Sequence, residues 1–167
     1  MILRVKLAVI GAVLLCLGAC QAAEVITLKT ALVQFVFDGD SFRALVDGQQ
    51  HELRLWGIDA PERHQTYADQ SKKALRELIQ GQRISIDVVA IDDYERLVVR
   101  ATKGNLQINR SMIEHGHAWW FKRYARHATD YAEAEQSARS NKRGLWQAPK
   151  PQAPWNWRAE QREQAEE

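Results

Sequence analysis

Between residues 24 and 60, short β-like runs follow one another without an intervening helix, and this order constrains the fold more than any other feature. The runs are rich in β-branched and apolar residues and occupy positions 25–28, 31–37, 42–46 and 51–58. Asp47-Gly48-Gln49 separates the last two, and Asp-Gly readily supplies the positive φ of a tight hairpin turn. The succession indicates a β-meander.

A helical pattern follows from Gln65 to Gln80, where apolar residues return at helical spacing before Gly81. Strand-like runs then resume, and two further helical patterns come after them, at 84–91, 97–102, 106–115 and 128–141. The order of strands, helix, strands and helices predicts an α+β, mainly β, fold. It fits a small barrel with helices packed outside it.

The N-terminus has the pattern of a targeting segment. Arg4 and Lys6 precede an almost wholly apolar run at 7–17, and small residues follow it. The run is shorter than the roughly 20 apolar residues that a bilayer span requires. We therefore expect residues 1–22 to be a secretory signal peptide.

Leu17-Gly18-Ala19-Cys20 also resembles the lipobox of bacterial lipoproteins, in which Cys20 would be lipidated. Ordinary cleavage near Ala22 is the alternative. We expect an exported protein that is periplasmic, anchored to the outer membrane through Cys20, or secreted. Because Cys16 and Cys20 are the chain's two cysteines, the domain that follows can form no internal disulfide and no cysteine-based zinc site.

The charge balance excludes one class of function. The chain has 23 basic and 21 acidic residues. Removal of Arg4 and Lys6 with the leader would make the two counts equal. A net charge near zero argues against a histone-like binder, so any grip on nucleic acid must be local.

Acidic residues and an arginine gather in two separated motifs. Asp38-Gly39-Asp40 comes first, Arg54 follows, and Ile58-Asp59-Ala60-Pro61-Glu62 comes next. Carboxylates bind hard divalent cations, and arginine clamps phosphate bidentately. Asp-Gly-Asp alone is most often a turn, but its coupling to the second motif favours a metal site, with Asp38 in a supporting role. The set favours phosphodiester hydrolysis.

These motifs resemble the signature of the thermonuclease, or staphylococcal-nuclease-like, family. The resemblance continues through Tyr94-Glu95-Arg96, Asn109-Arg110-Ser111-Met112-Ile113, Gly116-His117-Ala118-Trp119-Trp120 and Arg143-Gly144-Leu145-Trp146. It spans nearly all of the domain that we expect at 24–147. It implies an OB-fold, five-stranded β-barrel with three α-helices. It also implies a Ca²⁺-dependent endonuclease that cleaves DNA and RNA with little sequence preference, and we expect a monomer.

The resemblance implies a metal site and a base. Asp40 and Asp59 match the family's calcium carboxylates, and Ala60 would offer its backbone carbonyl where the family usually has threonine. Glu62 matches the glutamate that activates the attacking water. Two carboxylates, one carbonyl and several waters suffice for Ca²⁺, which tolerates irregular geometry.

The resemblance also implies a substrate site. Arg54 and Arg96 match the arginines that bind the scissile phosphate, and Tyr94 falls at a substrate-contacting tyrosine. Glu95 stands where the family usually has glycine, and Asp93 and Glu95 add negative charge beside the phosphate site. This loop is the main departure from the family pattern.

The stretch from Trp119 to Arg126 interleaves aromatic and basic residues, which suits base stacking beside a phosphate backbone. We expect Tyr124 at the substrate and Trp119 mainly packed in the core, as we do Trp146. His115-Gly116-His117 is more typical of a helix end than of a metal site.

Prolines interrupt the chain from Ala148 onward, and the residues after Arg158 have no apolar face beyond alanines. We expect 148–167 to be a loose, charged tail, with Trp155 and Trp157 able to fold back on the domain.

Two alternative functions remain. An OB-type nucleic-acid-binding module without catalysis is favoured by Asp93-Tyr94-Glu95. An envelope interaction protein is favoured, weakly, by the near-neutral charge. The three acids and two arginines argue against both.

Overall fold

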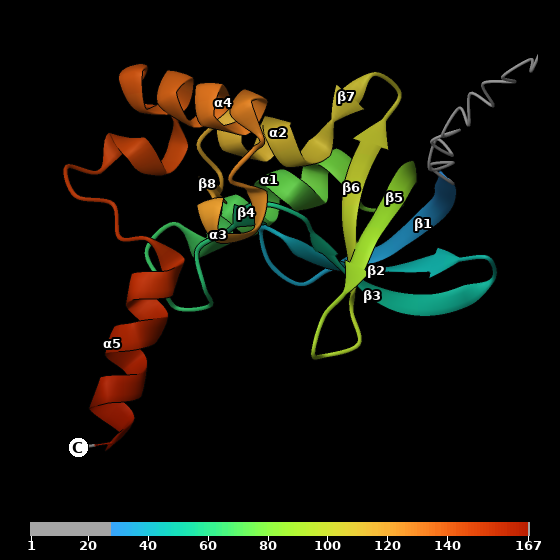
Figure 1. Ribbon diagram of the computed structural model, residues 1–167, viewed down its shortest axis with the longest axis horizontal. Helices are drawn as coiled ribbons and strands as arrows, with labels where there is room; N and C mark the ends of the chain where they lie inside the picture. Colours follow the sequence, from blue (N-terminus) through green and yellow to red (C-terminus); the bar gives the residue numbers. More distant parts are fainter. Residues whose placement is uncertain (1–27, 167) are drawn as a thin grey trace, which may run out of the picture.

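The computed structural model describes residues 28–166 of the 167-residue chain (Figure 1). The expected signal peptide and the lipidation at Cys20 lie outside the described residues, as does almost all of the first expected strand. No helix within 28–166 is both long and apolar enough to cross a membrane.

Five strands form a closed barrel, which confirms the OB-type, five-stranded prediction. The strands are β1 (Lys29–Val36), β2 (Ser41–Val46), β3 (Gln49–Leu55), β5 (Arg83–Ile91) and β6 (Leu97–Lys103). Their order is β3-β2-β1-β5-β6, and a parallel pairing of β3 with β6 closes the circle. We call this pairing, which joins Leu53–Leu55 to Leu97–Val99, the β3–β6 seam. A short strand, β7 (Leu106–Gln107), adds to β6.

Alternation of apolar residues drives the barrel's closure, because one face of each strand fills the interior. The inward side chains are almost completely buried and come from all five strands: Ala31, Val33, Phe42, Ala44, Leu53, Leu55, Ile84, Ile86, Val99 and Ala101. Irregular pairing at Val33/Phe35 and at Val88/Ala90 interrupts the register of β1 and β5. Such bulges bend strands, as a small barrel requires.

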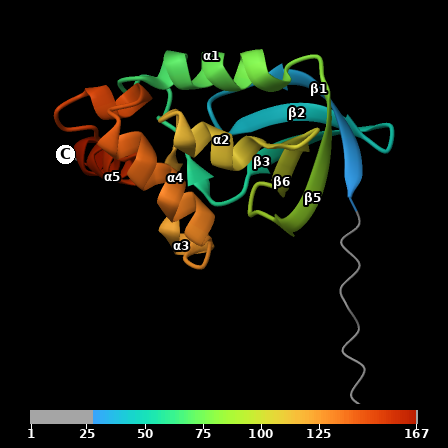
Figure 2. The same ribbon diagram turned by 90° about the horizontal axis from the view of Figure 1, so that it is seen from above.

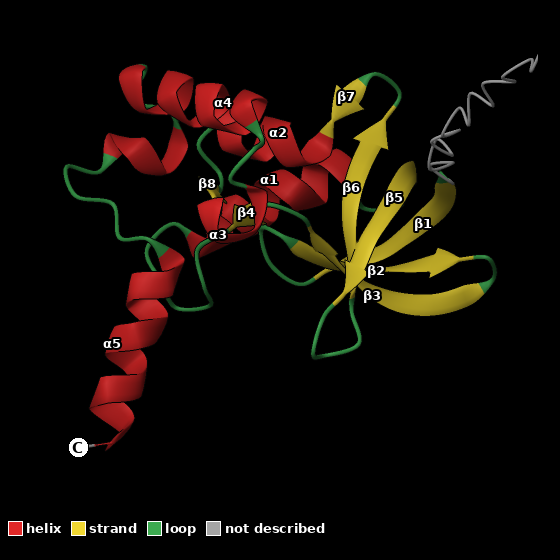
Figure 3. Cartoon of the chain, in the orientation of Figure 1, coloured by secondary structure: helices red, strands yellow, loops and turns green. Residues whose placement is uncertain are grey.

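The helices gather at one side of the barrel (Figures 2 and 3). They are α1 (Ala68–Ile79), α2 (Ile108–Glu114), α3 (Lys122–Ala125), α4 (Thr129–Ser140), the 3-10 helix η1 (Gly144–Gln147) and α5 (Pro154–Glu166). A two-stranded ladder of β4 (Ile58–Asp59) and β8 (Trp119–Trp120) lies among them. The described residues therefore hold more helices than the three expected.

The expected strand at 51–58 is in fact two strands. The chain turns at Gly57, which has φ +73° and whose missing Cβ would lie 2.8 Å from the Ala125 side chain. This close contact with α3 directs Ile58 and Asp59 away from β3 and into the ladder with β8.

The expectation of a loose C-terminal extension is wrong. Pro154 is the first residue of α5, a position where a missing N–H is no loss. Trp155 then stacks on Phe121 at 5.5 Å and lies edge-on to Trp119 at 5.7 Å between ring centroids. The helix is attached through its first turns, which is why its sequence has no continuous apolar stripe (Figure 1).

A buried asparagine ties α2 to the β3–β6 seam. Asn109 is 1% exposed, and its side-chain oxygen accepts a hydrogen bond from the Ala101 amide at 2.9 Å. Its nitrogen donates to the carbonyls of Trp56 and Val99, at 2.9 and 3.1 Å. Every hydrogen bond contributed by this side chain thus supports the strands that close the barrel.

Candidate active site

The turn between β1 and β2 presents the first acidic motif. Asp38 accepts hydrogen bonds from the backbone amides of Asp40 and Ser41, at 2.9 and 2.7 Å, and from the Ser41 hydroxyl at 2.6 Å. Asp38 therefore shapes the turn, which is a supporting role. Gly39 is required by close packing, because a Cβ there would overlap Ser71 of α1 and lie 2.7 Å from the Ala60 Cβ.

Arg54 joins the two acidic motifs. Ser41 pairs with Arg54 across β2 and β3, so the arginine side chain lies next to the Asp38–Asp40 turn. Its guanidinium donates to Asp40 Oδ1 at 3.0 Å and to Asp59 Oδ1 at 2.8 Å. The carboxylates are 2% and 0% exposed as residues. The structure thus brings Asp40, Arg54 and Asp59 together, and the Ala60 amide adds a 2.8 Å bond to Asp40 Oδ2.

Burial makes this cluster electrostatically demanding. Burial raises the pKa of Asp40, Arg54 opposes the rise, and the charges of Asp38 and Asp59 add to it. The Asp40 charge in turn raises the pKa of Arg54 well above its usual range. Asp40 is therefore short of positive charge, and a further cation beside it would be stabilised.

A second arginine supplies positive charge to Asp59 and Glu62 from the far end of the chain. Arg158 of α5 donates to Asp59 Oδ1 at 3.2 Å and Oδ2 at 2.8 Å, and it also pairs with Glu62 Oε1. Burial works against the charge of Arg158, but its bonds to Asp59 and Glu62 raise its pKa overall. Sequence reasoning missed this residue. An arginine in a proline-interrupted, charged segment carries no local signal of such a role.

Glu62 lies at the rim of the cluster, with a side chain 34% exposed. Its backbone amide donates to Gln65 Oε1 at 2.9 Å, and Gln65 Nε2 donates to the Gln152 carbonyl at 2.7 Å. The loop that carries Glu62 is thus linked directly to the segment before α5.

The guanidinium of Arg96 is directed to its own turn. It bonds Asp92 Oδ2 through Nε at 2.8 Å and Nη2 at 2.7 Å. Although burial acts in the opposite direction, the hydrogen bonds from Arg96 and Tyr94 lower the pKa of Asp92. Glu95, which stands where the resembled family has glycine, takes the left-handed φ of +61°. No hydrogen bond or ion pair among the described residues joins Arg96 to Asp40, Asp59 or Glu62.

The backbone nevertheless places Arg96 near Arg54. Arg54 pairs with Val98 across the β3–β6 seam, and Arg96 precedes Val98 by two positions. Arg96 therefore lies directly before β6, which begins at Leu97, and close in sequence to the residue that pairs with Arg54.

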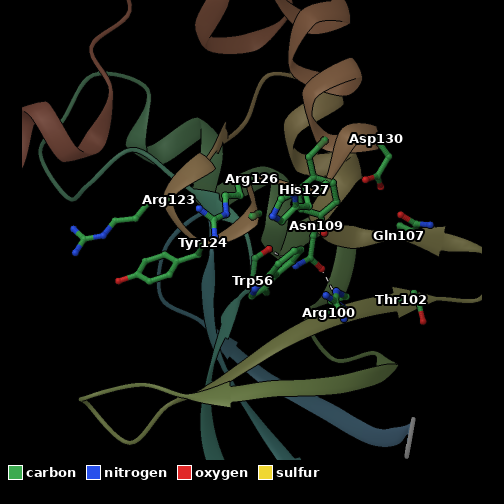
Figure 4. Close-up of a pocket in the computed structure, with 14 residues that line it drawn as sticks. Trp56, Arg100, Thr102, Gln107, Asn109, Arg123, Tyr124, Arg126, His127 and Asp130 are labelled. Carbon is green, nitrogen blue, oxygen red and sulfur yellow. Dashed lines mark hydrogen bonds between the residues drawn. The ribbon is translucent and has the colours of Figure 1, made fainter. Parts of the chain in front are cut away.

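The two predicted substrate tyrosines are exposed. Tyr94 is 80% exposed at the tip of the β5–β6 turn, and Tyr124 is 64% exposed in α3. Arg123 lies over the Tyr124 ring at 5.8 Å from its centroid. Arg123 and Tyr124 line a hollow of about 880 Å³. In Figure 4 the side chains of Arg123 and Tyr124 point to one side, while other basic side chains gather around Trp56, namely Arg100, Arg126 and His127.

The tryptophans expected in the core are buried: Trp119 and Trp146 are each 7% exposed, and their ring centroids are 4.3 Å apart. The two histidines have structural contacts. His117 Nδ1 lies 3.1 Å from the Tyr67 hydroxyl, burial lowers the pKa of His117, and His115 Nδ1 bonds the Ser111 carbonyl at 2.9 Å.

The donor set fits an open site for a hard cation rather than a closed cage. Within residues 28–166, no three histidine, cysteine or acidic side chains converge as a metal-binding group. Asp40 and Asp59 are nevertheless buried, each bonded by a different nitrogen of the Arg54 guanidinium, and the raised pKa of Asp40 indicates a shortage of positive charge beside it. Two carboxylates with the Ala60 carbonyl suit Ca²⁺, whose remaining ligands are commonly waters.

The fold and the site together define an OB-type barrel protein with an acid–arginine cluster at one edge. A family model described as staphylococcal nuclease homologue matches residues 52–148. The chain belongs to this family. The matched range includes Arg54, Asp59, Glu62 and Arg96 and ends before Arg158.

The chain is similar to several proteins named as nucleases. It is 40% identical over 114 residues to "Probable staphylococcal-like nuclease CAN2" of Oryza sativa subsp. japonica, covering 68% of this chain and 31% of that protein. It therefore spans only about a third of that longer relative.

Two bacterial relatives match over most of their length. An "Uncharacterized endonuclease" of Haemophilus influenzae is 31% identical over 147 residues, which cover 87% of this chain and 80% of that protein. A "Micrococcal nuclease" of Shigella flexneri is 33% identical over 134 residues, covering 74% and 76%.

Proposed function

We propose that the protein is a Ca²⁺-dependent endonuclease that hydrolyses phosphodiester bonds of DNA and RNA with little sequence preference. The observation that carries the proposal is the buried Asp40–Arg54–Asp59 cluster with Glu62 at its open rim. Names of relatives from rice, Haemophilus and Shigella support nuclease chemistry.

Asp40, Asp59 and the Ala60 carbonyl would hold the ion. When bound, Ca²⁺ supplies positive charge that polarises the phosphate and offsets the repulsion between carboxylates and substrate. The raised pKa of Asp40 supports this assignment, because a buried carboxylate short of positive charge gains most from a cation.

Glu62 would act as the general base. A partly exposed carboxylate at the rim can take a proton from water while that water's oxygen attacks phosphorus. The bond between phosphorus and the leaving oxygen breaks, and solvent protonates that oxygen. Arg54 remains charged at any working pH and would stabilise the negative charge that develops on the phosphate.

Arg96 would join Arg54 on the phosphate after turning away from Asp92. Its position directly before β6, two residues from the Val98 that pairs with Arg54, supports this role. Tyr94 and Tyr124 would contact the substrate, since both rings are exposed and lie beside arginines.

The central test is cleavage by the purified protein. Single- and double-stranded DNA and RNA would each be incubated with Ca²⁺, with Mg²⁺ and with a chelator. We expect Ca²⁺ to support hydrolysis and the chelator to abolish it. Unchanged hydrolysis in chelator would exclude the metal mechanism.

Glu62→Gln tests the base. We expect turnover to fall by about 10²- to 10⁴-fold while substrate binding is largely retained. Glu52→Gln is the matched control, because Glu52 is an exposed acid of β3 that pairs with Arg43 at 3.0 Å. Equal turnover in Glu62→Gln and wild type would remove Glu62 from the chemistry.

A nucleic-acid-binding module without catalysis is the second candidate. It is favoured by the engagement of Arg96 with Asp92 and by the two bonds of Arg158 to Asp59. Binding without cleavage under every metal condition would support it.

We also propose export, with residues 1–22 as the signal region and Cys20 as the lipidated residue at the start of the mature protein; ordinary cleavage near Ala22, which would remove Cys20, is the alternative. Palmitate labelling would compare wild type with Cys20→Ser. Labelling of the serine variant would exclude Cys20 as the modified residue.

A further inference from the structure

A groove of about 560 Å³ lies between α5 and the segment from Trp119 to Arg123. One part of its lining is aromatic. Phe121 and Trp155 are both half-buried, and their rings stack at 5.5 Å with an angle of 17° between planes. The pair forms a flat apolar wall that joins α5 to the domain.

The rest of the lining is strongly basic. Lys122, Arg123 and Arg162 line the groove with exposed residues, and none has an acidic partner within 4.0 Å among residues 28–166. Glu135 is the acid of the lining, but it is 7% exposed and already pairs with Arg139 at 3.2 Å. It also accepts the Trp120 amide. The groove is therefore a local excess of positive charge in a chain that is otherwise near neutral.

Arg158 joins this groove to the acidic cluster. It belongs to the groove lining, and its guanidinium contacts both oxygens of Asp59 together with Glu62. The groove thus ends at the residues that carry the proposed hydrolysis.

We propose that this groove binds the single strand of nucleic acid next to the bond being cleaved, and that Arg158 binds a phosphate at its inner end. The inference rests on the proposed function and adds to it a strand-binding site made by α5. Aromatic walls with unpaired cations are the features that hold single strands without sequence preference.

The contacts of Arg158 parallel those of Arg54. Each guanidinium bridges two acids, Arg54 between Asp40 and Asp59, and Arg158 between Asp59 and Glu62. Three carboxylates thus face two arginines. A cation held by Asp40 and Asp59 would supply the positive charge that Arg158 supplies here, and Arg158 would then be free to bind a phosphate.

Binding rather than cleavage is the decisive measurement. A labelled single-stranded DNA of about 12 nucleotides, with phosphorothioate linkages that resist hydrolysis, would be titrated with the protein in Ca²⁺ at several salt concentrations. Thermal unfolding would confirm that each variant is folded. The variants are Arg158→Gln and Arg162→Gln, and the control is Arg83→Gln, an exposed arginine of β5 outside the groove.

We expect Arg158→Gln to weaken binding about tenfold, equivalent to the loss of one charge-assisted contact. The slope of log K against log salt is negative, and it should become less steep by about 0.7 for each lost phosphate contact. Arg162→Gln should make the slope less steep likewise, and Arg83→Gln should change neither the affinity nor the slope. Because Arg162 is exposed on α5, its variant keeps the test valid even where Arg158→Gln unfolds.

Two results would overturn the proposal that the groove binds a nucleic-acid strand. One is an affinity and slope in Arg158→Gln and Arg162→Gln equal to those of Arg83→Gln. The other is tighter binding by Arg158→Gln, which would make α5 a cover over the acids. If the wild type cleaves and Arg158→Gln and Arg162→Gln bind the strand normally, only the proposal of strand binding in the groove is contradicted. If the wild type binds the strand without cleaving nucleic acid, only the proposed nuclease function is contradicted.

Discussion

Arg54 lies in the β3–β6 seam and Arg96 lies directly before β6, yet their surroundings are opposite. Arg54 bridges two buried carboxylates that come from separate parts of the chain. Arg96 bonds a single, partly exposed aspartate four positions before it, in a turn that holds Glu95 at φ +61°.

The difference teaches how firmly each side chain is positioned. Strand register and buried partners fix Arg54, so its movement would leave charges unpaired in the interior. One local ion pair at a surface turn holds Arg96, and such pairs contribute little free energy. Arg54 is therefore preorganised for a phosphate, whereas Arg96 must exchange one partner for another.

The largest expected effect comes from Arg54→Gln, which removes the preorganised arginine. It leaves Asp40 and Asp59 buried without their shared cation, so we expect a loss of about 3–5 kcal/mol in the free energy of unfolding. Cleavage should fall by at least about 10²-fold. Urea unfolding and a cleavage assay would measure both.

Arg43→Gln is the control for this variant, because Arg43 forms an exposed pair with Glu52 on the same two strands. Its cost should stay below about 1 kcal/mol. Similar losses in the two variants would mean that burial does not distinguish the Arg54 pairing.

Asp40→Asn tests the charge shortage around Arg54. The folded pKa of Asp40 is raised, so the folded state binds more protons than the unfolded one and metal-free stability should fall as pH rises through that pKa. Asparagine should remove this slope, because it does not titrate.

The same substitution should shrink the rise in Tm caused by Ca²⁺. Thermal unfolding against pH, with and without Ca²⁺, gives all of these quantities. Asp47→Asn, at an exposed acid that pairs with Lys29, is the control. An unchanged Ca²⁺ response in Asp40→Asn would remove Asp40 from the metal site.

Glu95→Gly tests backbone strain in the turn that carries Arg96. A non-glycine residue in the left-handed region costs about 1–2 kcal/mol, so glycine should stabilise the protein by about 1 kcal/mol after its own entropy cost. Asp93→Gly, in the same turn but without a positive φ, should destabilise instead. A midpoint of urea unfolding that falls in both variants would contradict strain at Glu95.

Asp92→Asn has the smallest expected effect and would free Arg96. We expect a loss of about 0.5 kcal/mol together with a few-fold gain in affinity for the phosphorothioate strand. Because the folded pKa of Asp92 is lowered, the wild-type contribution is present above pH 3.8 and is lost as pH falls through the folded value. A lower affinity of Asp92→Asn for the strand would show that Arg96 acts on the substrate from its present position.

Local sequence patterns predicted a small barrel and favoured a cluster around Arg54, and the family resemblance supplied the OB-type, five-stranded form. Alternating apolar residues predict the strands, and Asp40, Arg54 and Asp59 lie near strand ends that the barrel brings together. The resemblance also marked Glu95 as the main departure from the family pattern, and this residue takes a positive φ. The direction of the Arg96 side chain does not follow from the sequence, because it depends on a rotamer that one neighbouring acid selects.

The docking of the C-terminal helix α5 could not be predicted from local sequence patterns. Its anchor is Trp155, whose partners Trp119 and Phe121 belong to a distant segment. Arg158 lies 99 positions from Asp59, and only the docking of α5 brings the two together. Helical periodicity reports a helix that is packed along its length, not one held at a single end.

Asn109 also has a consequence for the order in which the chain folds. Its bonds to Ala101 and Val99 are local, but its bond to the Trp56 carbonyl spans 53 positions and cannot form until the end of β3 has met β6. Parallel pairing between distant strands is slow, because loop-closure entropy is lost before any contact compensates for it. A side chain whose last bond forms only on closure acts as a check on register, and that bond places the completion of the barrel late in folding.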